Sequence, residues 1–109
     1  MPDFKALLDS DESDLYQQLG WAVEKAAASD DEAEQAGRSF FEARIAGFAG
    51  AVCGNGAISK LRRDGADAVT LAGAIADVLL ALGGIPGVAT VAVLLVKYGL
   101  NKLCGPLPP

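Results

Sequence analysis

The segment "ALGGIPGVATVAVLLV", residues 81–96, contains no charged side chain, and the uncharged run extends back to Val78. In a chain of 109 residues with a net charge of −5, so much apolar sequence needs a covering surface. Glycines 83 and 84 end one predicted helix, and Pro86 suits the first turn of the next, where its missing N–H is not needed. A strand is the alternative for the valine-rich half, but the continuation "KYGLNKL" favours a helix. The segment therefore predicts an apolar helical hairpin over residues 67–103, with helices at 68–82 and 86–103.

Upstream of this hairpin the sequence predicts two amphipathic helices. The first covers about residues 11–28, where acids follow Ser10 and apolar residues recur at spacings of three and four. The stretch "SDDE" at 29–32 is a capping box that begins the second helix, with Ser29 as the cap and Glu32 able to reach back to its backbone N–H. "GNG" at 54–56 ends this helix. Small residues between 43 and 54 indicate that another helix approaches closely, and the hairpin is the expected neighbour.

The remaining elements complete an all-α chain. A short helix is predicted at 57–63, with Gly65 in the left-handed position that follows it and Asp67 as the cap of the next helix. The length predicts one domain, residues 1–109. We expect a small single-domain bundle of about five or six helices: acidic N-terminal helices within 3–53, the short helix, the strongly apolar hairpin, and a proline-rich tail at 104–109.

Charge is unevenly distributed along the chain. Residues 1–34 carry ten acids and two bases, whereas residues 35–109 carry four acids and seven bases. Nucleic-acid binding requires a basic face, so the acidic balance argues against a nucleic-acid partner. The one basic cluster, Lys60, Arg62 and Arg63, is interpreted as a solvated helix face.

Catalytic and metal-binding patterns are missing from the sequence. There is no histidine, and Cys53 and Cys104 are too far apart in sequence to form a zinc-type pair. We therefore predict no enzyme activity, no cofactor and no metal. The N-terminus does not resemble a signal peptide, so the chain is expected in the cytoplasm, with both cysteines as free thiols whose loss is tolerated.

Asp77 is the exception in an otherwise apolar helix, "LAGAIADVLLAL". A buried carboxylate without a partner is unfavourable. In an antiparallel hairpin Asp77 would lie opposite Ala92, so the predicted partner is Arg38 or Arg44 of the long helix.

The composition favours a protein-protein interaction or assembly module that self-associates or docks on a larger protein. A helix that is apolar on every side must be covered on every side, and two amphipathic helices offer only one apolar stripe each. The alternative is a membrane-inserting hairpin, because residues 78–96 approach the length of a bilayer span, although "GGIPG" divides them. The predicted interaction surface comprises Val69, Ile75, Val78, Leu79, Leu82, Val91, Leu94 and Leu95.

Overall fold

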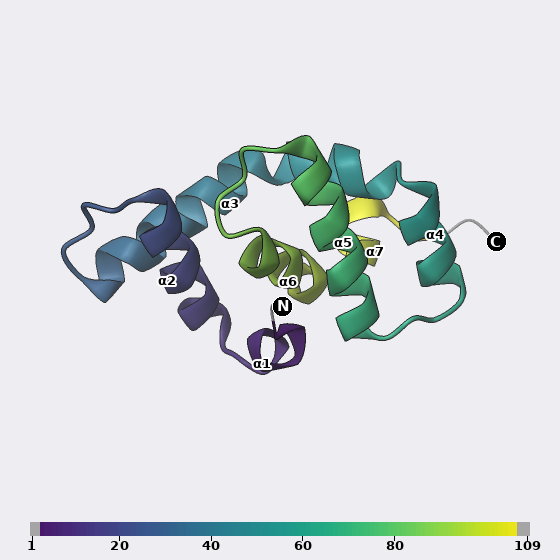
Figure 1. The fold of residues 1–109 in the computed structure, drawn as a ribbon, viewed down its shortest axis with the longest axis horizontal. Coiled ribbons are helices and arrows are strands. Elements are labelled where there is room, and N and C mark those ends of the chain that lie inside the picture. The colour runs from purple at the N-terminus through teal and green to yellow at the C-terminus, as the bar shows by residue number, and fades with distance from the viewer. Residues whose placement is uncertain (1–2, 107–109) are drawn as a thin grey trace.

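The computed structural model describes residues 3–106, and this part of the chain is all-helical, without strands (Figure 1). Its longest dimension is 47 Å and the other two are 25 and 23 Å. The described residues form seven helices in the order α1 (Phe4–Leu8), α2 (Glu12–Val23), α3 (Asp30–Cys53), α4 (Gly56–Arg63), α5 (Ala68–Leu82), α6 (Val88–Tyr98) and α7 (Leu100–Cys104).

Side-chain caps set the beginnings of four of these helices, and at α1 the Asp3 carboxylate accepts the N–H of Ala6. The hydroxyl of Ser29 accepts the N–H of Glu32 at 3.2 Å, and Asp67 accepts the N–H of Thr70 at 2.8 Å, as predicted. The Glu32 carboxylate reaches back one residue further than expected, to the N–H of Ala28. Asn55 caps α4, so "GNG" ends one helix and begins another. These bonds satisfy N–H groups that lack partners within the helix.

Two predicted helices have different bounds in the structure. The helix expected over 11–28 ends at Val23, because the Glu24 carboxylate accepts the N–H of Ala26 and turns the chain. The helix expected over 86–103 begins only at Val88, and Gly99 divides it into α6 and α7. Gly99 has a φ of 101°, which a residue with a side chain rarely adopts.

Helix α6 is the centre of the core. Its six consecutive residues from Thr90 to Leu95 are all buried, so the helix is covered around its full circumference. Contacts with α1, α2, α5 and α7 supply this cover. In Figure 1 α6 is strongly foreshortened whereas α5 lies across the view, so the two helices cross. The two helices of the predicted hairpin contact each other, but its antiparallel arrangement is not confirmed.

The closest helix-helix contact is between α2 and α3. A β-carbon on Gly20 would overlap the carbonyl group of Ala33, and one on Gly37 would overlap the carbonyl oxygen of Tyr16. The small residues predicted to receive the hairpin are not used in this way, because Gly47 and Gly50 have no atom within 4 Å of the position of an added β-carbon. The close approach thus occurs earlier in α3 and with a different neighbour.

Cys53 and Cys104 form a disulfide, with 5.4 Å between their Cα atoms. The prediction of two free thiols is wrong. Each cysteine is the last residue of its helix, and the fold brings the ends of α3 and α7 together although 51 positions separate the two cysteines. Sequence spacing contains no information about this meeting of helix ends.

Candidate interaction surface

Most of the predicted interaction surface belongs to the core of the same chain. Five of the eight predicted interaction residues have at most 2% exposure, namely Ile75, Leu79, Val91, Leu94 and Leu95. The prediction failed for these residues because the short helices α1 and α7, which it did not count as cover, also pack on α6. Val78 is half-buried, and only Val69 and Leu82 are exposed, by 42% and 57%.

The predicted buried ion pair of Asp77 is not formed. Asp77 is exposed, and within residues 3–106 it has no ion pair with Arg38 or Arg44. Asp77 lies on the uncovered side of α5, where water solvates its carboxylate and no counter-charge is needed. Arg38 instead pairs with Glu34 at 3.1 Å, and the Arg44 guanidinium lies 5.0 Å from the centre of the Phe40 ring.

The exposed apolar residues at the end of α5 adjoin a hollow in the surface. This hollow, which we call the α3/α5 notch, has a volume of about 210 Å³ and is lined by Arg44, Gly47, Phe48, Leu82, Gly83 and Ile85. Phe48 is only 3% exposed and belongs to the core, whereas Leu82 is largely exposed. An engineered apolar cavity of about 150 Å³ can hold benzene, so the notch is large enough for an aliphatic side chain.

Leu80 is the most exposed large apolar residue of the described chain, at 63%, and it is not among the predicted interaction residues. It lies in the last turn of α5, between the buried Leu79 and the exposed Leu82. In "DVLLAL" nearly every position is apolar, so spacing alone does not distinguish the outward side of the helix. Together, Leu80 and Leu82 make the end of α5 the most apolar exposed turn in this helix.

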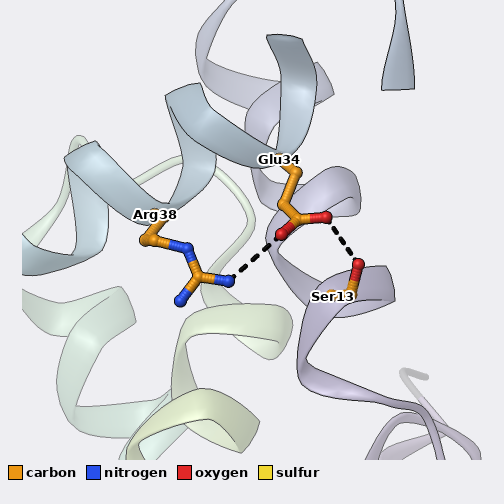
Figure 2. Close-up of polar contacts among 3 residues, drawn as sticks. All are labelled: Ser13, Glu34 and Arg38. Carbon is orange, nitrogen blue, oxygen red and sulfur yellow. Dashed lines mark hydrogen bonds and ion pairs between the residues drawn. The ribbon is translucent and has the colours of Figure 1, made fainter. Parts of the chain in front are cut away.

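A polar contact joins α2 and α3 at the other end of the molecule (Figure 2). The Ser13 hydroxyl donates to Glu34 Oε1 at 2.5 Å, and the Arg38 guanidinium donates to Glu34 Oε2 at 3.1 Å. Arg38 also lies 4.3 Å from the centre of the Tyr16 ring, whose phenol has its pKa raised by burial. The hydrogen bond from Ser13, followed by that from Arg38, holds the pKa of Glu34 below its usual value.

This lowered pKa predicts how stability depends on pH. The pKa of a glutamate in an unfolded chain is about 4.3, and the pKa of Glu34 in the folded chain is lower. The contact therefore stabilises the fold above the unfolded pKa, and this stabilisation is lost as the pH falls through the folded pKa. We expect Glu34→Gln to lower the free energy of unfolding at neutral pH and to reduce its dependence on pH in acid.

Denaturant unfolding at a series of pH values measures this effect. Glu42→Gln is the control, because Glu42 is an exposed glutamate of the same helix without a side-chain hydrogen bond to another described residue. If the free energy of unfolding of Glu34→Gln depends on pH in acid as that of the wild-type chain does, Glu34 is not the source of this dependence.

Residues 3–106 have neither a candidate membrane span nor a candidate metal site. None of their helices is long and apolar enough to cross a bilayer. No group of three or more cysteine or acidic side chains is gathered there in a way that could hold a metal ion. Comparisons with family models, curated proteins and solved structures find no match to this chain.

Proposed function

We propose that the chain is a non-enzymatic assembly module that pairs with a second copy of itself at the α3/α5 notch. The single observation that carries this proposal is the exposed Leu82 beside an open hollow whose floor is Phe48. Exposed apolar groups that border a hollow are typical of protein contacts. The notch takes the place of the predicted interaction surface of the hairpin, because most of those residues are buried in the core of the same chain.

The notch is self-complementary, which favours a second copy as its occupant. Leu82 supplies a projecting aliphatic side chain, and the same surface supplies a hollow that can receive one. In a two-fold symmetric dimer each copy would place its Leu82 against Phe48 and Ile85 of the other. Such an interface uses the same surface twice, which is the commonest symmetry of homo-oligomers.

Charge also favours association at this surface. The net negative charge of the chain lies in residues 1–34, which include α1, α2 and the beginning of α3. Figure 1 shows the α2–α3 turn at one end of the molecule, whereas the end of α5 lies over the later half of α3. Pairing at the notch therefore leaves the acidic ends apart, and like-charge repulsion between two copies is small.

Sedimentation velocity tests the proposal. We expect the wild-type chain to sediment as a dimer at up to about 1 mM, which detects even a weak association. Leu82→Ser should weaken this dimer by roughly fivefold or more, since truncation of an interface hot spot costs more than about 1 kcal/mol. Because Leu82 is largely exposed, circular dichroism should show an unchanged helical fold.

Val69→Ser is the matched control, because Val69 is an exposed apolar residue at the other end of α5. It should leave the dimer intact. A wild-type chain that remains monomeric at the highest concentration would refute self-association. If Leu82→Ser and Val69→Ser weaken the dimer equally, the dimer interface does not lie at the notch.

The cytoplasmic location belongs to this proposal as a prediction. It was inferred from the N-terminus, and the free thiols expected as its consequence are not found, because Cys53 and Cys104 form a disulfide. Disulfides persist mainly in oxidising compartments. The assembly proposal does not depend on the compartment, because the notch and the disulfide involve different residues.

A further inference from the structure

A second and larger pocket lies at the opposite end of α5 from the notch. Its volume is about 400 Å³, which is within the range of small-molecule sites. Leu71 of α5, Val96 of α6 and Leu100 of α7 provide aliphatic walls, and Arg62 of α4 is the one charged residue in its lining. The pocket thus combines an apolar interior with a single cation.

The Arg62 side chain is held in place by α7 and the residue that follows it. Its Nη2 donates to Asn101 Oδ1 and to the carbonyl oxygen of Gly105, both at 2.9 Å. The disulfide ties this part of the chain to the end of α3 through Cys104. Both bonds use the same terminal nitrogen, so neither of them uses the N–H groups of Nη1 and Nε.

The charge of Arg62 has no carboxylate partner within residues 3–106. The nearest acids in sequence are engaged elsewhere: Asp64 pairs with Lys60 at 3.5 Å, and Asp67 caps α5. Arg62 is nevertheless half-buried, and a half-buried cation is stabilised by an opposite charge. The pocket therefore offers one cation, without a competing carboxylate among residues 3–106, to a ligand with one negative charge.

We infer that this pocket binds a small aliphatic monocarboxylate. The carboxylate would accept hydrogen bonds from the Nη1 and Nε N–H groups of Arg62, and the hydrocarbon chain would lie against Leu71, Val96 and Leu100. A single guanidinium matches the single charge of a carboxylate, and charge-assisted bonds of this kind are stronger than neutral ones. This inference concerns a different surface from the dimer interface, so either can fail without the other.

Titration of the isotope-labelled wild-type chain with hexanoate, followed by NMR, tests the inference. We expect saturable shifts of the Leu71, Val96 and Leu100 methyl resonances. Hexanamide has nearly the same shape without the charge, and it should bind at least about tenfold more weakly. This comparison needs no mutation and is independent of any effect on folding.

Two variants then assign the effect to one residue. Arg62→Met should weaken hexanoate binding by at least about tenfold, whereas Arg63→Met, at the exposed neighbouring position on α4, should leave it unchanged. Equal binding of hexanoate and hexanamide, or equal binding by the two variants, would overturn the inference. Saturation by a short peptide with a free C-terminal carboxylate, without saturation by hexanoate, would also overturn it in favour of a polypeptide ligand.

Discussion

Replacement of both Cys53 and Cys104 by serine is expected to lower the free energy of unfolding by about 4 kcal/mol. The disulfide joins residues at a sequence separation of 51, and this crosslink removes many conformations from the unfolded chain. For a domain whose whole stability is about 5–15 kcal/mol, this is a large fraction. Guanidinium unfolding of the wild-type and double-serine chains measures the difference.

Reductant supplies the control for this prediction. Dithiothreitol should destabilise the wild-type chain by a similar amount and should leave the double-serine variant unaffected, because that variant has no disulfide to reduce. A wild-type chain with the same unfolding midpoint in the presence and absence of reductant would show that the crosslink is not formed in solution.

Substitution of Gly37 by alanine is expected to have the second-largest effect, a destabilisation of about 3 kcal/mol or more. The added β-carbon would overlap the backbone carbonyl of Tyr16, and a backbone atom cannot rotate away as a side chain can. Helices α2 and α3 would have to separate along their contact. Gly20→Ala should act in the same way through the carbonyl of Ala33.

Gly50→Ala is the matched control, because it makes the same chemical change in the same helix and Gly50 does not line the notch. The added methyl group meets no atom within 4 Å. Alanine is favoured over glycine in a helix by about 1 kcal/mol, so this variant should be more stable than the wild type. Chemical denaturation of the two variants should give opposite signs, and destabilisation of similar size at both positions would contradict the packing argument.

The residues of the two candidate sites could be predicted only in part from the sequence. Leu82 was predicted to face a partner and is exposed, but Phe48 and Ile85, which complete the notch, come from elements whose relative position no spacing predicts. Arg62 was interpreted as part of a solvated helix face. Its place in a pocket depends on α7, which was predicted as part of one long helix and which Gly99 separates from α6.

What the sequence by itself determined is the local structure. The caps at Ser29 and Asp67 and the glycine after α4 were predicted correctly, because each depends on hydrogen bonds or backbone angles within a few residues. Capping residues and apolar spacing along the chain also sufficed for the all-helical class. These features require no knowledge of which helix lies beside which.

The tertiary structure decided which apolar surfaces are covered and which residues meet. Helix α6 is enclosed by four other helices, so its leucines and valines stabilise the chain itself and leave the end of α5 as the exposed part. The Cys53–Cys104 crosslink and the exposure of Asp77 follow from the same arrangement. Burial is a non-directional interaction that any apolar face can satisfy. The choice among faces therefore depends on helix lengths, crossings and close contacts, such as those at Gly20 and Gly37, that arise only when the whole chain packs.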